Sequence, residues 1–132
     1  MSDGGERLVL GMGASSRAEP DAATAFVRDC LARAGVDPGR IACLATLDRK
    51  GDAAAILAVA RALSVPVERL PANRLALVEG RLTSVSARAK AATGLAGVAE
   101  AAALSAAGDG ACLLLPRQAG AGVTCAIAGG AS

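Results

Sequence analysis

Apolar residues fall into short runs that alternate with amphipathic stretches through the first half of the chain. The runs at residues 8–10, 41–45 and 67–70 are bounded by glycine or polar residues, which predicts buried strands. Between them, apolar residues recur at helical spacing over residues 20–34 and 52–63. Strands that alternate with such helices are typical of a parallel sheet, whose ligands normally bind beyond the carboxyl ends of the strands.

Both of these helices carry end signals. Pro20 and Asp21 open the first helix, and Gly35 stops it. Asp52 is expected to cap the second helix, because an aspartate side chain can accept hydrogen bonds from the first free N–H groups.

The second half of the chain predicts more helix and then a pair of strands. Helices are expected at residues 73–79, 83–93 and 98–107. Residues 111–115 and 123–128 favour strands, and the glycine-rich turn at 116–122 between them predicts an antiparallel hairpin.

No linker or shift in composition divides the 132 residues. We therefore expect one α/β domain over residues 1–132, with a mostly parallel sheet, helices on both faces and a C-terminal antiparallel hairpin. Residues 1–6 and 129–132 are expected to be frayed.

The hydrophobic share of 53% does not indicate a membrane protein, because about a quarter of the residues are alanine. No apolar run approaches the ~20 residues that a membrane helix needs, and the first residues lack a signal-peptide pattern. We expect a cytoplasmic protein without a membrane partner.

The chain contains no histidine, which excludes Ser-His-Asp and Cys-His nucleophile schemes and any histidine-ligated metal. Cys30, Cys43, Cys112 and Cys125 are widely spaced in apolar surroundings, which favours buried reduced thiols over a zinc site or disulfides. We expect no metal and no cofactor. With a net charge of +2 and Phe26 as the single aromatic residue, nucleic acid is not an expected partner.

The end of the first apolar run predicts an anion-binding turn. Small residues, two hydroxyls and an arginine stand there directly before a helix, and the residues expected to bind substrate are Gly11, Gly13, Ser15, Ser16 and Arg17. Glycine lets a ligand approach the backbone, and the N–H groups at a helix start favour negative charge. Alternatively, the glycines serve close packing of a strand and a helix. Because Ser16 replaces the third glycine of a dinucleotide fingerprint, nucleotide binding is a less favoured reading.

A second polar loop follows the second strand. Thr46, Asp48 and Lys50 supply a hydroxyl, a carboxylate and an ammonium group there. Six basic residues in or next to loops suggest a site for a polyanion, namely Arg17, Arg49, Lys50, Arg88, Lys90 and Arg117. Thr46, Lys50 and Arg117 are expected to bind the substrate there. The alternatives are a hydrophilic turn and an ordinary solvated surface.

Glu100 is the only charge in the alanine-rich stretch of residues 95–107. We expect it to face Thr93 and Gly94 of the preceding turn, which would then also contact the substrate. The alternative is a carboxylate that the helix dipole favours at a helix start.

Taken in order, these segments resemble the CobE family of cobalamin biosynthesis proteins and the C-terminal domain of CbiG, the cobalt-precorrin-5A hydrolase. The resemblance covers nearly the whole chain. The matching segments are residues 11–17, 45–50, 84–90 with Thr93-Gly94, 98–104 and 117–128.

The resemblance implies a role in building the corrin ring of vitamin B12 on a single α/β domain that binds a tetrapyrrole intermediate. Such intermediates carry many carboxylates, which suits a cleft bordered by arginine, lysine and helix N–H groups. If the domain also opens a lactone, we expect Arg17 and turn N–H groups to hold the oxyanion and Asp48 or Glu100 to position water. The alternative is a non-catalytic carrier that passes the intermediate between other enzymes of the pathway.

Overall fold

The computed structural model describes residues 8–14, 18–47, 53–71, 98–107 and 112–129. Within these residues the chain forms one mixed sheet of five strands, in the order β3-β2-β1-β5-β4. The strands are β1 (Leu8–Ala14), β2 (Ile41–Leu47), β3 (Val67–Leu70), β4 (Cys112–Gly120) and β5 (Val123–Gly129). The parallel pairs β1–β2 and β2–β3 and the antiparallel pairs β1–β5 and β4–β5 confirm the predicted α/β class with a C-terminal hairpin.

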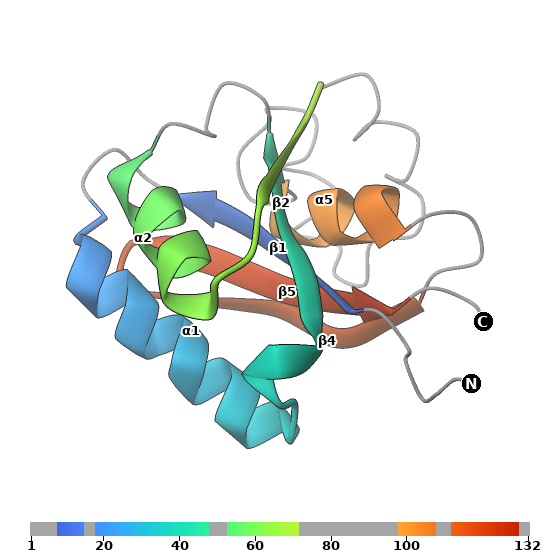
Figure 1. Ribbon diagram of the computed structural model, residues 1–132, viewed down its shortest axis with the longest axis horizontal. Coiled ribbons are helices and arrows are strands. Elements are labelled where there is room, and N and C mark those ends of the chain that lie inside the picture. The colour runs from blue at the N-terminus through green and yellow to red at the C-terminus, as the bar shows by residue number, and fades with distance from the viewer. Residues whose placement is uncertain (1–7, 15–17, 48–52, 72–97, 108–111, 130–132) are drawn as a thin grey trace.

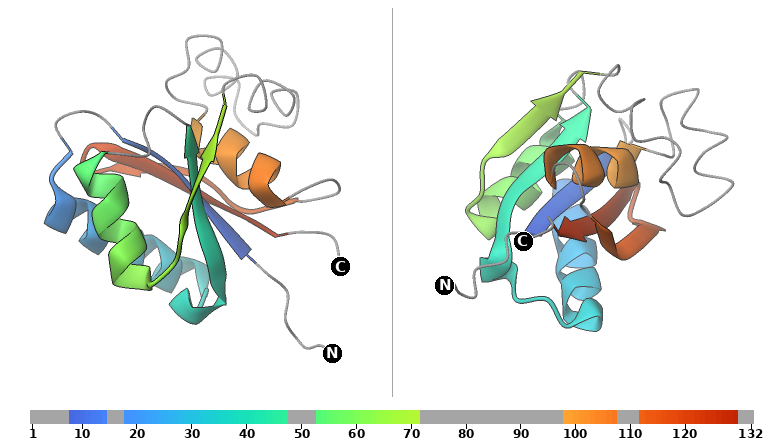
Figure 2. Two further views of the ribbon diagram at one scale, coloured as in Figure 1. Left: turned by 45° about the horizontal axis from the view of Figure 1, so that its top comes forward. Right: turned by 90° about the vertical axis from the view of Figure 1, so that its right-hand side faces the viewer.

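Helices cover both faces of the sheet (Figures 1 and 2). Helices α1 (Pro20–Ala34) and α2 (Ala54–Leu63) pack on one face, and helix α5 (Val98–Ala107) packs on the other. Alternate residues along a strand point to opposite faces, so each strand contributes to two hydrophobic layers. In β1, for example, Leu8, Leu10 and Met12 face α1 and α2, whereas Val9 lies in the layer beneath α5.

Helix α1 begins and ends where its sequence predicts. The side chain of Glu19 accepts hydrogen bonds from the N–H groups of Asp21 and Ala22, and Pro20 occupies the first helical position. Gly35 adopts the left-handed conformation after the last turn, with a φ of 72°. A short 3₁₀ helix, η1 (Pro38–Arg40), then leads into β2.

Helix α2 departs from its predicted start. It begins at Ala54, and its N-cap residue is Ala53, which has no side-chain oxygen to offer the first N–H groups. The prediction that Asp52 is the N-cap is therefore wrong, because a helix start depends on backbone geometry that an aspartate one position away does not determine. Asp52 itself lies outside the described residues.

The hairpin turn is shorter than predicted. Residues 116–120, expected in the turn, belong to β4, and the turn consists of Ala121 and Gly122 with φ values of 53° and 78°. Positive φ at both positions is typical of the two-residue turn that matches the twist of paired strands. Pro116 does not end β4, because β4 is an edge strand whose register with β5 shifts around it.

The ends of the predicted elements show one further difference. Gly129, the first residue of the tail expected to fray, pairs with Leu8 and Cys112 in the sheet. Residues 130–132 and the helices expected at 73–79 and 83–93 lie outside the described residues. The helix expected at 98–107 is present with those bounds.

Candidate functional site

The carboxyl ends of three strands and the tip of the hairpin lie together at one end of the sheet. β1, β2 and β3 end there at Ala14, Leu47 and Leu70. Ala14 pairs with Val123, the first residue after the turn at Ala121–Gly122, so the turn lies at the same end. This end of the sheet, defined by Ala14, Leu47, Leu70 and the turn 121–122, is termed the rim. The twist of the sheet spreads it into an arc (Figure 1).

Three helices begin on the rim side of the sheet. α1 starts shortly after β1 ends, and α2 starts shortly after β2 ends. α5 lies across Gly11 and is followed by β4, whose first residue, Cys112, lies at the opposite end of the sheet beside Gly129. α5 therefore runs away from the rim, and all three helices point their positive dipole ends toward it (Figure 2).

Several predicted site residues fall in segments that leave this rim. Ser15, Ser16 and Arg17 follow Ala14, and Asp48 and Lys50 follow Leu47. These five residues, together with Thr93 and Gly94, lie outside the described residues. The structure therefore locates the strand ends from which these two segments continue, and the proposed contacts of the seven residues stay predictions.

Gly11 lies inside β1, between β2 and β5, and not in the predicted turn. A Cβ atom at this position would stand 2.0 Å from the carbonyl oxygen of Ala99 and 2.7 Å from the backbone nitrogen of Ala103. The alternative explanation, that glycine permits close packing of a strand and a helix, therefore applies to Gly11. The turn was placed too early because small residues continue the strand as far as Ala14.

Gly13 also belongs to β1, where it is buried and pairs with Thr124 of β5. Thr124 also pairs with Ala119 of β4, so these three residues share the sheet face that α5 covers. They make a floor of small side chains with one half-buried hydroxyl beside the rim. Thr124 was missed in the sequence, although its place between the buried Val123 and Cys125 signals the opposite face of the strand.

Thr46 is fully buried in β2 and does not extend into a loop. Its Oγ1 donates a hydrogen bond of 2.8 Å to the carbonyl oxygen of Met12 in β1. This bond joins the two central parallel strands close to the rim. Thr46 therefore has a structural role beside the rim, and its hydroxyl is not exposed to a ligand in this structure.

Glu100 and Arg117, two predicted site residues 17 positions apart, are in direct contact. The Glu100 side chain has no exposed surface, and its Oε2 accepts a 2.8 Å hydrogen bond from the backbone N–H of Arg117. Arg117 lies where the β4–β5 register shifts between Leu115 and Gln118, so an N–H in this irregular stretch needs a partner outside a regular ladder. The carboxylate thereby fixes the path of β4 against the start of α5.

The four cysteines are reduced, but they are not all buried. Cys30 and Cys125 are buried, Cys43 is half-buried and Cys112 is exposed, so the expected burial is wrong for Cys112. Its position in an edge strand, which has a solvent-facing side, explains the difference. Burial, and then the adjacent Cys30 thiol, raise the pKa of Cys125 well above its ordinary value.

Two features are absent from the described residues, a metal-binding cluster and a membrane-spanning helix. No group of three or more His, Cys, Asp or Glu side chains in that part of the chain is arranged to hold a metal ion. No helix within the same residues is long and apolar enough to cross a membrane.

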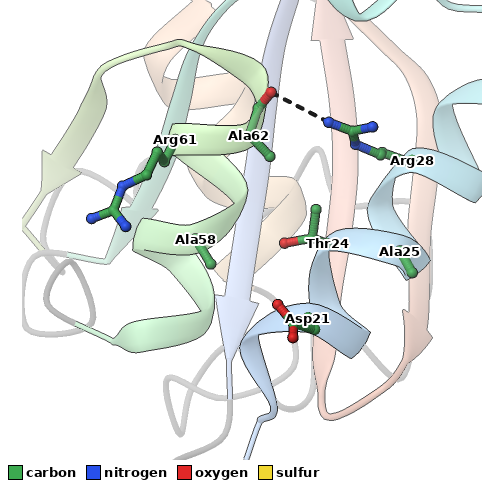
Figure 3. Close-up of a pocket in the computed structure, with 7 residues that line it drawn as sticks. All are labelled: Asp21, Thr24, Ala25, Arg28, Ala58, Arg61 and Ala62. Carbon is green, nitrogen blue, oxygen red and sulfur yellow. Dashed lines mark hydrogen bonds between the residues drawn. The ribbon is translucent and has the colours of Figure 1, made fainter.

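A surface groove of about 470 Å³ lies between α1 and α2. Its lining residues are Asp21, Thr24, Ala25, Arg28, Ala58, Arg61 and Ala62 (Figure 3). None of the predicted site residues lines it, so this groove is separate from the candidate site at the rim.

Comparison with known proteins identifies the family. Residues 8–128 match the family described as cobalamin synthesis G C-terminus. Protein CobE of a Sinorhizobium species is 39% identical over 128 residues, which cover 97% of this chain and 83% of that protein.

Solved structures agree with this match. The crystal structure of CobE, described as a protein from the cobalamin biosynthetic pathway, has a TM-score of 0.81 at 32% identity, covering 94% of this chain and 90% of that one. The cobalamin biosynthesis protein chiG of Agrobacterium tumefaciens gives 0.71 at 33% identity, covering 95% and 99%. A cobalamin biosynthesis protein G homolog of Sulfolobus solfataricus gives 0.72 at 21% identity, covering 94% of this chain and 37% of that one, and shows the fold alone.

Sequence match, identity and fold agree with the resemblance that the ordered motifs predict. The chain is a cobalamin biosynthesis protein and belongs to the CobE/CbiG C-terminal family.

Proposed function

We propose that the protein binds a carboxylate-rich corrin-ring intermediate at the rim. The observation that carries this proposal is that α1, α2 and α5 all begin on the rim side. Helix N-termini attract anions through their dipoles and free N–H groups, and a corrin intermediate carries acetate and propionate carboxylates around its ring. The start of α2 suits this role best, because its N-cap residue, Ala53, has no side-chain oxygen. At the start of α1, by contrast, the Glu19 side chain already accepts from the N–H groups of Asp21 and Ala22.

The floor beside the rim suits the flat part of the ligand. On this face Ala119 is exposed and Thr124 is half-buried, and both present little side-chain volume, while Gly13 is buried beside Thr124. A broad apolar ring needs such a shallow surface, with its charged substituents at the periphery. We place Arg17 and Lys50 at that periphery, because they follow the ends of β1 and β2 by a few residues.

In this proposal Glu100 and the backbone of Arg117 have a structural role, because their hydrogen bond holds β4 against the start of α5. A carboxylate that activates water needs access to that water, whereas Glu100 has no exposed surface and accepts a hydrogen bond from the backbone of β4. Binding without a chemical step is therefore the function that the described residues favour. In this role the protein would carry or protect the intermediate between other enzymes of the pathway.

Titration calorimetry with cobyrinic acid and its fully methylated ester tests carboxylate recognition. The two ligands share the ring and differ in charge, so the acid should bind more tightly. Arg17→Ala and Lys50→Ala should each weaken binding of the acid by ~1–3 kcal/mol, the usual range for losing a charge-assisted contact. Arg33→Ala is the matched control, because Arg33 lies in the last turn of α1 and pairs with Asp29.

Two results would contradict the proposal: equal affinity for acid and ester, or unchanged affinity in both Arg17→Ala and Lys50→Ala. A second assay separates binding from catalysis. The protein is incubated at substoichiometric amounts with pathway intermediates, and the ligand is analysed by mass spectrometry. An unchanged mass in the retained ligand supports the carrier, whereas a new mass that accumulates over several turnovers indicates an enzyme.

A further inference from the structure

The groove between α1 and α2 has a charge pattern that the proposed function does not use. On α1, Asp21, Ala25 and Arg28 follow one another at spacings of four and three residues, so they form one stripe on the helix surface. On α2, Ala58, Arg61 and Ala62 line the same groove. Both helices thus offer small residues and an arginine, while the aspartate comes from α1 alone.

The two signs of charge are separated along the groove. α1 and α2 each follow a parallel strand, so both run away from the rim in the same direction. Asp21 is in the first turn of α1 and therefore lies at the rim end, whereas Arg28 lies near the far end of the groove. Arg61 borders that end from α2, with its guanidinium on the flank of α2 away from α1 (Figure 3). The middle is occupied by small or short side chains, namely Thr24, Ala25 and Ala58.

We propose that this groove is the interface of a homodimer, in which a second copy of the chain lies antiparallel across it. A two-fold axis through the small middle residues would place each Asp21 opposite Arg28 and Arg61 of the other copy. Such an interface is self-complementary, as two-fold symmetry requires. The small middle residues let the helices of two copies approach closely, and the arginines can pair with carboxylates through a planar fork.

Two further observations support a second copy over a uniformly acidic partner. An acidic partner would place a negative charge against Asp21, whereas an antiparallel copy matches both ends of the groove. Leu57, one turn before Arg61 on α2, is a large hydrophobic side chain that is 39% exposed, and it would lose contact with water at the edge of such an interface. One terminal guanidinium N–H of Arg28 donates at 3.5 Å to the carbonyl oxygen of Ala62, so the Arg28 side chain reaches from α1 toward the end of α2 (Figure 3).

Sedimentation velocity and light scattering over a range of protein concentrations test the proposal. The wild-type chain should form a dimer, and Asp21→Arg should abolish it by placing like charges together. The triple variant Asp21→Arg, Arg28→Glu, Arg61→Glu should dimerise with itself, because the pattern is inverted at both ends. It should not form mixed dimers with the wild-type chain.

The control is Glu68→Arg, which makes the same charge change at an exposed residue of β3 outside the groove. It should leave the dimer intact, and circular dichroism should show that every variant is folded. A wild-type chain that stays monomeric at all concentrations would overturn the proposal. So would a folded triple variant that stays monomeric, or a loss of dimer in Glu68→Arg equal to that in Asp21→Arg.

Discussion

Replacing Gly11 by alanine should destabilise the protein strongly, because helix α5 occupies the space that the new methyl group needs. The added Cβ would lie 2.0 Å from the Ala99 carbonyl oxygen, and 2.7 Å and 2.8 Å from the nitrogen and Cβ of Ala103. None of these atoms belongs to a long side chain that can rotate away. Relief therefore requires movement of the helix backbone.

The size of the effect follows from that geometry. Bringing the contact from 2.0 Å to 3.0 Å, below which Cβ atoms are hardly ever found, moves α5 by about 1 Å. α5 packs on β1, β2, β4 and β5, and its residues 99–104 are buried, so this shift loosens a close-packed layer. Overpacking usually costs about 1–3 kcal/mol, and a clash with backbone belongs at the upper end. A loss of ~3 kcal/mol corresponds to a fall of ~10 °C in Tm for a domain of this size.

Urea unfolding followed by circular dichroism measures this change, since the chain has no tryptophan or tyrosine for fluorescence. Gly39→Ala is the matched control, because its new Cβ would meet nothing closer than the Asp37 carboxylate at 3.4 Å. That control should change stability by less than about 0.5 kcal/mol. If Gly11→Ala proves as stable as Gly39→Ala, the packing of α5 on β1 described above is wrong.

Three other predictions concern contacts around the sheet. Glu100→Ala should destabilise the protein by ~1–3 kcal/mol, because the N–H of Arg117 loses its acceptor, whereas Glu100→Gln retains an oxygen and should lose less; equal losses in urea unfolding would refute this role. Gly120→Ala should lower the free energy of unfolding, because its Cβ would lie 2.6 Å from Cε1 of Phe26. Adding Phe26→Leu should recover part of this loss in a double-mutant cycle, and strictly additive changes in the free energy of unfolding would exclude the contact. The pKa of the Cys125 thiol is raised in the folded state, so the unfolded chain loses this proton first as pH rises. The stabilisation is therefore fully present below about pH 9, and above that pH the free energy of unfolding declines by up to ~1.4 kcal/mol per pH unit. Cys125→Ala should flatten this decline, and an unchanged slope in that variant would contradict the role of Cys125.

The alternation of strands and helices could be predicted because it rests on local periodicity. Apolar spacing placed α1 with both its ends, and α5 with the bounds observed. The hairpin was harder, because Pro116 and the glycines around it resemble a turn unless it is known that β4 is an edge strand. Strand order depends on contacts between distant segments, which a local pattern does not contain.

The sequence predicts where the strands that lead to the candidate site end, and it predicts the role of each residue less well. The pattern of elements predicts that two polar segments follow neighbouring parallel strands. The ends of β1 and β2 do lie at the same end of the sheet. Gly11, Thr46 and Glu100 are different, because each looks like a residue that binds ligand until its partner in the fold is known. Glycine, threonine and glutamate satisfy packing and buried hydrogen bonds as readily as they bind substrates.

A crystal structure of the protein with cobyrinic acid bound is the decisive test of corrin binding at the rim. We expect the ring to lie over Ala119 and Thr124, with carboxylates directed toward the start of α2 and toward Arg17 and Lys50. A ring bound in the groove between α1 and α2, or on any surface away from the rim, would contradict this expectation.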